Sequence, residues 1–400
     1  MQFQFLSLSL ALATSLMTGT QAAAIVPGRP VHATSLSSLA LQKVLDDAAP
    51  IFGAYKNDQS YTATWMKKYP DSTRLYHMNI PGTHDSATWN YSQATQDALL
   101  HLTDLNDDVP APASWYRCQD QPFINMLNGG IRAFDLRFAF DPTNSTIVFY
   151  HSQALQSETA TINDVLYGFY YWLDNHPSET IFLSFMNEGS TARYAHFDAT
   201  VQLAIFDALT DTVAQNYFVQ TKGELVTLGE ARGKITLLRR FNLDQLPPSY
   251  EAAMPGLHFN GSNWTDNDPD ITLQYNSAKG LNAYIEDFYE MDSPIGSSAT
   301  LNVAWKYNAT TAHLLKATQQ HPDSLFWSFA SSEYTSNIPP NTPQIQALGN
   351  GTEITPLGGV NDRLVPFLRG LKGKRVGIVM FDFFEQPSNL IETFLSLQNP

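Results

Sequence analysis

The chain has 400 residues, 43% of them hydrophobic and 15% charged, which is enough apolar material for one large core or two modest ones. Its formal net charge of −15 argues against nucleic acid as a partner and against non-specific adhesion to anionic lipid, because long-range repulsion opposes both. Cys118 is the only cysteine, so an internal disulfide is excluded and stability must come from packing.

Residues 1–24 have the pattern of a secretory signal peptide, with an apolar stretch at 6–16 and three alanines at 22–24 for cleavage. A buried N-terminal helix is the alternative. No other run is long and apolar enough to span a bilayer, and the C-terminus carries no lipid-anchor tail, so we expect a soluble, secreted, monomeric glycoprotein. Sequons for N-glycosylation stand at Asn90, Asn144, Asn260, Asn263, Asn308 and Asn350.

A short helical extension, residues 25–70, precedes the expected catalytic domain, residues 71–400. Positions 39–49 are apolar at helical spacing, and Pro50 is expected to end that helix. The clearest later helix is 162–173, entered at Asn163 and Asp164 and ended before Pro177. Strand-like runs occupy 75–80, 131–138, 147–150, 180–185, 235–238, 283–288, 325–330 and 376–381.

The alternation of strand-like runs with longer segments predicts a parallel sheet, and eight runs predict an α/β fold of the (β/α)8 TIM-barrel type. The spacing is uneven, because His151 follows Arg137 by only 14 residues, too few for a crossover helix. We therefore expect a distorted barrel with its active site at the C-terminal ends of its strands.

Polar side chains stand at or just after the end of most runs, where a barrel would gather them on one rim. Any one of them is an ordinary loop residue, so the argument is their convergence. They are His84, Arg137, His151, Asn187, Glu188, Arg239, Arg240, Asp287, Glu333 and Asp382.

Two histidines, His84 and His151, can together take and give a proton at the two ends of a reaction. We expect residues 81–83 to form a tight turn that lifts His84 clear of the sheet. A carboxylate from Asp85 or Asp382 would fix its tautomer. The alternative for either ring alone is a loop histidine bonded to backbone.

Arg137 is expected to bring a guanidinium to the rim, where an anion must offset its burial. Asp135 points to the same side of the strand and can orient it. A purely structural ion pair between the two is the alternative reading.

Arg240, Asp287 and Tyr289 follow later strands and suit a polyol, because Arg and Asp bind hydroxyl groups and a ring stacks on the polyol face. Ordinary solvated strand ends are the alternative. The remaining histidines lack metal-ligand spacing, so we expect neither a metal nor another cofactor.

At these residues the chain resembles the phosphatidylinositol-specific phospholipase C X-domain family, in the metal-independent form that bacteria and fungi secrete. The resemblance runs from about Trp65 to Glu385, and the family fold is a distorted (β/α)8 barrel. The matching segments are residues 80–86 (IPGTHDS), 130–137 (GIRAFDLR), 150–151 (YH), 177–181 (PSETI), 231–235 (ARGKI) and 238–240 (LRR).

The resemblance implies a role for each proton-transfer residue. His84 would be the general base on the inositol 2-hydroxyl, oriented by Asp382. His151, assisted by Asp85, would protonate the leaving diacylglycerol oxygen. The products would be diacylglycerol and a 1,2-cyclic inositol phosphate, because the nucleophile belongs to the substrate.

The resemblance also assigns the charged and inositol-binding positions. Arg137, supported by Asp135 in the substrate site, would stand where metal-dependent relatives hold calcium. Arg240 and Asp287 would bind inositol hydroxyls, and the inositol ring would pack on Tyr289.

One segment departs from the family pattern. Metal-independent relatives tend to carry lysine after the fourth strand, whereas residues 183–188 here read LSFMNE. A cation near the substrate is therefore missing, and Glu188 offers a carboxylate that could recruit one.

We expect a phosphodiesterase of the lyase type that acts on an inositol phospholipid during transient contact with a membrane. A metal-dependent enzyme that cleaves glycerophosphodiesters is one alternative, and it needs a carboxylate cluster where Arg137 stands. A catalytically silent barrel that only binds inositol lipid is the other.

Overall fold

The computed structural model describes residues 35–103, 110–188, 196–291, 294–349 and 357–398. The expected signal segment 1–24 and the sequon asparagine Asn350 lie outside them. The chain divides into two compact units after Ala40, and the strands all belong to the unit formed by residues 41–400.

The strands are β1 Ile80–Thr83, β2 Ala133–Phe140, β3 Ile147–His151, β4 Ala154–Leu155, β5 Ile181–Asn187, β6 Ile235–Arg239, β7 Leu257–His258, β8 Asp268–Asn276, β9 Leu281–Asp287, β10 Leu325–Phe329 and β11 Ile378–Phe381. The α-helices are α1 Leu36–Phe52, α2 Gln93–Thr103, α3 Phe123–Asn128, α4 Ile162–Asn175, α5 Ala199–Thr210, α6 Ala214–Tyr217, α7 Leu228–Ala231, α8 Pro248–Ala253, α9 Ala299–Gln319, α10 Pro343–Leu348, α11 Val360–Arg369 and α12 Leu390–Leu395. The 3-10 helices are η1 Trp65–Lys68, η2 Leu75–His77, η3 Ser86–Asn90, η4 Ala113–Trp115 and η5 Gly261–Asn263.

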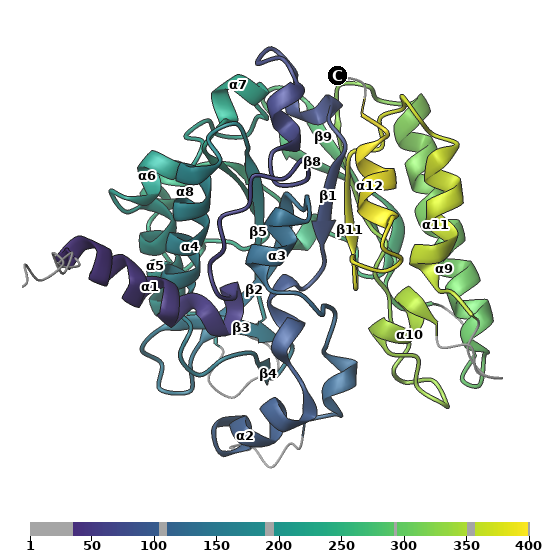
Figure 1. The fold of residues 1–400 in the computed structure, drawn as a ribbon, viewed down its shortest axis with the longest axis horizontal. Coiled ribbons are helices and arrows are strands. Elements are labelled where there is room, and N and C mark those ends of the chain that lie inside the picture. Colours follow the sequence, from purple (N-terminus) through teal and green to yellow (C-terminus); the bar gives the residue numbers. More distant parts are fainter. Residues whose placement is uncertain (1–34, 104–109, 189–195, 292–293, 350–356, 399–400) are drawn as a thin grey trace, which may run out of the picture. The chain divides into compact units, whose positions relative to one another are not determined.

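The central sheet follows the order β7-β6-β5-β2-β1-β11-β10-β9-β8, and every neighbouring pair from β7 to β9 is parallel. Strand β8 joins the far edge antiparallel to β9. Among the described residues β7 and β8 do not pair, so the barrel is nearly closed. In Figure 1, α4 and α5 flank the strands on one side and α9 and α11 on the other. The expected distorted α/β barrel is confirmed.

The strand carrying His151 lies outside the parallel order. Strand β3 pairs antiparallel with the end of β2, and β4 folds back on β3. This explains the short interval after Arg137, because antiparallel neighbours need only a turn between them. The turn passes through Asn144, whose φ is 58°.

The first expected strand, 75–80, is wrong. Residues Leu75–His77 form η2, where the amides of His77 and Met78 bond back three residues. The strand is Ile80–Thr83, so residues 81–83 are not the expected tight turn. Pro81 is tolerated there because its ring nitrogen falls where β2 has not yet begun, and its carbonyl accepts from the Arg132 amide at 2.8 Å.

Two helix expectations differ in their ends. Helix α1 continues through Pro50 to Phe52, because Ile51 and Phe52 extend its buried face. Helix α4 is confirmed and starts at Ile162 as expected, after the N-cap Thr161, but it continues two residues further than expected, to Asn175. A capping box with Asp164 satisfies its first amides. No described helix is both long enough and apolar enough to cross a bilayer.

Candidate active site

A pocket of about 420 Å³ opens at the C-terminal ends of the parallel strands. Most of the expected rim residues reach it, together with several aromatic side chains from the loops. Its lining includes His84, Trp115, Tyr116, Arg137, His151, Ser152, Met186, Arg240, Phe259, Gly261, Trp264, Asp266, Asp287, Tyr289, Glu333, Thr335 and Asp382.

His84 follows β1 directly, and its ring is fixed from the end of β11. Its Nδ1 lies 2.9 Å from Asp382 Oδ1, so Asp382, not Asp85, is the carboxylate that holds this ring. The Asp382 side chain is buried, and the side-chain amide of Asn361 donates to the backbone carbonyl of Asp382 at 2.9 Å. Burial and, after it, the Arg137 charge lower the pKa of His84 to about 4, so the imidazole is neutral near pH 7.

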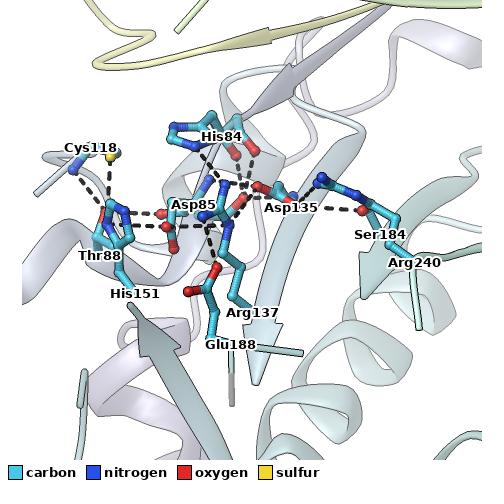
Figure 2. A network of polar contacts seen from close by, with 12 residues as sticks. His84, Asp85, Thr88, Cys118, Asp135, Arg137, His151, Ser184, Glu188 and Arg240 are labelled. Atoms are coloured by element: carbon cyan, nitrogen blue, oxygen red, sulfur yellow. Dashed lines mark hydrogen bonds and ion pairs between the residues drawn. The ribbon is translucent and has the colours of Figure 1, made fainter. Parts of the chain in front are cut away.

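Arg137 projects from β2 into a cage of carboxylates, at the centre of Figure 2. Its Nε lies 3.2 Å from Asp135 Oδ2 and 3.4 Å from Asp85 Oδ2. Its Nη1 donates to Glu188 Oε1 at 2.9 Å. Its Nη2 lies 2.8 Å from Nε2 of His84, which must accept because a guanidinium only donates. The hydrogen-bonding pattern therefore assigns the ring proton of His84 to Nδ1.

Asp85 sits in a strained left-handed conformation with φ 40° at the start of η3. Its side chain is fully buried, and its amide donates to Asp135 Oδ2 at 3.3 Å. Burial raises the pKa of Asp85 well above its ordinary value, although Arg137 opposes this. Asp85 is thus a carboxyl group that can hold a proton inside the site.

His151 ends β3, and its ring centroid lies 6.2 Å from that of His84. Its Nδ1 is 2.6 Å from the carbonyl of Tyr116 and 3.1 Å from Asp85 Oδ2. We assign the Nδ1 proton to the carbonyl, because no described donor is aligned with either Asp85 oxygen. Burial and then Arg137 lower the pKa of His151, so its Nε2 is the free basic nitrogen in the resting site.

The expected polyol-binding residues form a second group in the same pocket. Arg240 lies over the Trp264 ring at 4.0 Å and reaches Asp287 Oδ2 at 3.8 Å. The Trp264 indole donates to Asp287 Oδ2 at 2.7 Å, and the Tyr289 hydroxyl donates to Asp266 at 2.9 Å. Arg240 also reaches Asp135 Oδ1 at 3.4 Å, which joins this group to the Arg137 cage.

Three of the expected rim residues do not line the pocket: Glu188 still contacts Arg137 there, but the expectations for Arg239 and Asn187 are wrong. Arg239 points to the opposite side of β6 from Arg240, because successive strand residues alternate, and it binds Glu251. Asn187 donates to the carbonyl of Phe138 at 3.1 Å and is not part of the pocket lining. Met186 takes the place in the lining at this strand end.

The sequence did not predict the aromatic wall made by Trp115, Tyr116, Phe259 and Trp264. Trp264 and Phe259 follow β7, which has only two residues and gave no strand signal. Trp115 and Tyr116 come from η4, between β1 and β2, where no rim loop was expected. The signal available in the sequence was the presence of these four aromatic residues in two loops, which could have indicated an aromatic wall.

Two places could in principle hold a metal. His84, Cys118 and Asp382 offer donors within 4.8 Å of one another. There Nδ1 of His84 already donates to Asp382, and burial raises the pKa of the Cys118 thiol well above its ordinary value, which weakens it as a ligand. The oxygens of Asp85, Asp135 and Glu188 suit calcium better, but the Arg137 guanidinium stands between them.

A parallel barrel whose rim carries two imidazoles, their carboxylates and a caged guanidinium has the composition of an acid–base phosphodiesterase. Residues 105–241 match the model of the phosphatidylinositol-specific phospholipase C X domain, which includes Arg137, His151 and Arg240 but not His84 or Asp382. The chain belongs to the phosphatidylinositol-specific phospholipase C X-domain family.

Curated relatives are similar over part of their length. A 1-phosphatidylinositol phosphodiesterase of Staphylococcus aureus (strain Newman) is 26% identical over 231 residues, 56% of this chain and 64% of the relative. One of Listeria monocytogenes is 28% identical over 207 residues, 50% of this chain and 56% of the relative. PI-PLC X domain-containing protein 1 of Mus musculus is 31% identical over 145 residues, covering 33% and 41%. The chain thus spans less than two thirds of these relatives.

Solved structures share the fold over most of the chain. A double mutant of the S. aureus phosphatidylinositol-specific phospholipase C superposes with a TM-score of 0.64 at 18% identity, over 84% of this chain and 97% of that one. The L. monocytogenes enzyme gives 0.57 at 21% identity, over 85% and 99%.

Proposed function

We propose that the protein is a metal-independent phosphorus–oxygen lyase that cleaves phosphatidylinositol, or a related inositol phospholipid, to diacylglycerol and a 1,2-cyclic inositol phosphate. One observation carries the proposal: Arg137 contacts the neutral nitrogen of His84 and lies within 3.4 Å of Asp85, which itself approaches His151. A candidate general base (His84), a cation (Arg137) and a candidate acid (His151 with Asp85) thus lie close enough together to contact one phosphodiester group.

The resting contact between Arg137 and His84 defines the first step. A phosphodiester anion attracts the guanidinium, and Nη2 shifts from the His84 nitrogen to a phosphoryl oxygen. The freed Nε2 then takes the proton of the inositol 2-hydroxyl, whose oxygen attacks phosphorus. Asp382 holds the resulting imidazolium through Nδ1.

The leaving side is served by His151 and Asp85. The bond from phosphorus to the diacylglycerol oxygen breaks, and that oxygen takes a proton from His151. Burial lowers the pKa of His151, and Asp85, whose Oδ2 lies 3.1 Å from the His151 Nδ1, is the carboxylate that stabilises its protonated form. Arg137, held by Asp135, balances the charge of the phosphoryl oxygens.

Arg240, Asp287 and Tyr289 are proposed to bind the inositol. The side chains of Arg240 and Asp287 are already oriented by Trp264, so little ordering is needed when hydroxyl groups bind. Met186 gives this wall an apolar surface where a lysine was expected.

We also propose that the enzyme is secreted and meets its substrate at a lipid surface. Four of the five described sequon asparagines, Asn90, Asn144, Asn263 and Asn308, are exposed as glycosylation requires, and Asn260 is half-buried. Ile295 and Ile338, in the loops whose earlier residues Tyr289 and Thr335 line the pocket, are 66% and 72% exposed. Asn337 ties their two loops together, through the Gly296 amide at 2.7 Å and the Ser297 carbonyl at 2.9 Å. We call Ile295 and Ile338 the rim pair.

The metal-dependent alternative is disfavoured because Arg137 fills the carboxylate cage, and a silent barrel is disfavoured because each proton-transfer residue has its partner. The decisive experiment is incubation with phosphatidylinositol in excess chelator, followed by phosphorus NMR of the water-soluble product. We expect the five-membered cyclic ester. Replacement of His84 or His151 by Ala should lower the rate about 10²–10⁴-fold.

Three results would contradict the proposal. Loss of activity with chelator, restored by calcium, would favour the metal-dependent reading. Turnover of glycerophosphodiesters without inositol would change the substrate class. Binding of inositol lipid with no turnover would indicate the silent barrel.

A further inference from the structure

Glu188 ends the segment 183–188, in which this chain departs from the pattern of its family, and the structure gives both of its oxygens a partner. Oε1 accepts from Arg137 Nη1 at 2.9 Å, and Oε2 accepts from the backbone amide of Ser152 at 2.9 Å. Its own amide donates to the Phe138 carbonyl at 3.0 Å. One buried carboxylate therefore connects the ends of β5, β2 and β3.

The amide of Ser152 matters because this residue comes directly after His151. Ser152 has φ 49°, a left-handed conformation that a non-glycine residue keeps only when neighbouring contacts hold it. Among the described strands, β3 pairs only with β4 and with the end of β2, and both pairings are antiparallel. Glu188 thus supplies a tie between the hairpin that carries His151 and the barrel that carries Arg137.

We infer that Glu188 is a positioning residue that fixes the distance and orientation between Arg137 and His151, an inference that rests on the proposed lyase function. It does this by accepting two hydrogen bonds at once, one from the cation and one from the backbone beside the general acid. Recruitment of a cation by Glu188 is the competing reading, and such an ion would have to displace Arg137.

The chemistry of the side chain makes the inference testable. A glutamine amide has one acceptor oxygen, so Glu188→Gln keeps one of the two bonds and turns a donor toward the other partner. Glu188→Asp keeps the charge but is one methylene shorter and cannot span both donors. Glu290→Gln removes a charge next to the pocket residue Tyr289, where the Glu290 carboxylate accepts from the Ser336 hydroxyl at 3.0 Å, and serves as the control.

The charge of Glu188 gives a readout that a merely structural role would not move. Burial lowers the pKa of His151 most, Arg137 lowers it next, and Glu188 raises it. Removing the carboxylate should therefore lower the pKa of His151. Because the general acid must be protonated, the alkaline limb of the kcat profile should move to lower pH.

The experiment measures kcat, KM, the pH profile and the histidine ring NMR titration of the wild type and the three variants. For Glu188→Gln we expect a fall in kcat of about 10–100-fold with KM little changed, a displaced alkaline limb and a lower titration midpoint for His151. For Glu188→Asp we expect a similar loss of kcat with a smaller displacement. Glu290→Gln should match the wild type.

The titration needs no substrate, so it tests Glu188 even if phosphatidylinositol is not cleaved. An inactive wild type with the expected titration shift would reject the proposed function and keep the inference. An unchanged His151 titration in a folded Glu188→Gln, checked by its thermal midpoint, would overturn the inference. So would calcium activation of the wild type that Glu188→Gln abolishes, since Glu188 would then be a cation ligand.

Discussion

The His84 ring shows how one arginine can serve two purposes. In the resting site Arg137 donates to the nitrogen that must later accept a proton, and so keeps the imidazole neutral. In the proposed mechanism, the same guanidinium then moves toward the phosphate charge when substrate enters. The pairing of His84 with Asp382 was one of two options open from sequence, because residues 85 and 382 are both aspartates near strand ends. Only the register of β1 with β11 decides between them.

This pairing predicts the acidic limb of the pH profile. The base is active only when unprotonated, and burial lowers the pKa of His84 from its ordinary value of 6.5 to about 4. The rate should therefore rise through about pH 4 and not through 6.5, as measured by kcat/KM against pH.

Replacing Asp382 by Asn tests the orienting carboxylate. The amide removes the charge that stabilises the His84 imidazolium, so we expect kcat to fall about 10²–10⁴-fold with little change in substrate binding. Wild-type turnover in this variant would show that another group holds the ring.

Among the elements, strand β1 is closely packed between its two neighbours in the sheet, β11 and β2. An added methyl group at Gly82 would lie 2.4 Å from Met380 Sδ and 2.9 Å from the Ala133 carbonyl, so only glycine lets β1 fit between β11 and β2. The next residue but one is His84, and the fit of this strand therefore sets the position of the base.

Gly82→Ala should destabilise the protein by about 1–3 kcal/mol in urea unfolding, because the backbone of Ala133 cannot move aside. The matched control is Gly261→Ala, whose added methyl meets nothing within 4 Å and should change stability little. Equal stabilities of the two variants would contradict the tight fit of β1.

The sequence predicted the strands that have long apolar runs and the polar residues that end them. The strand prediction failed at η2. Residues Leu75 to Met78 are mostly apolar, as in a strand, but their backbone forms a 3-10 helix. The prediction also missed β7 and β8, since β7 has two residues and β8 has an exposed face at the sheet edge. The partners of Glu188 could not be predicted, because they depend on how the β3 hairpin folds back.

For the molecule as a whole, the net charge of −15 restricts the lipid surfaces it can approach. The rim pair is aliphatic, and residues 280–305 and 322–350 around it contain neither Lys nor Arg. We therefore expect docking on zwitterionic lipid through apolar contact, weakened when anionic lipid is added at low salt.

Replacing both residues of the rim pair by Ser should weaken binding to phosphatidylcholine vesicles about tenfold or more, because two apolar side chains lose their contact with lipid. Turnover of soluble glycerophosphoinositol should stay unchanged. Leu203→Ser is the control, since this 38% exposed side chain lies on α5. An equal effect of the control would place the docking surface elsewhere.

The hairpin origin of β3 separates the two halves of the proposed substrate site. The proposed polyol side is built by β6, β9 and their loops within the continuous sheet, whereas the proposed leaving-group side is attached to one edge of β2. We therefore expect insertions or exchanges in the β3–β4 hairpin to alter which alcohol is expelled while the barrel strands keep their register. Engineered variants thus have one segment to change that should leave the proposed polyol side intact.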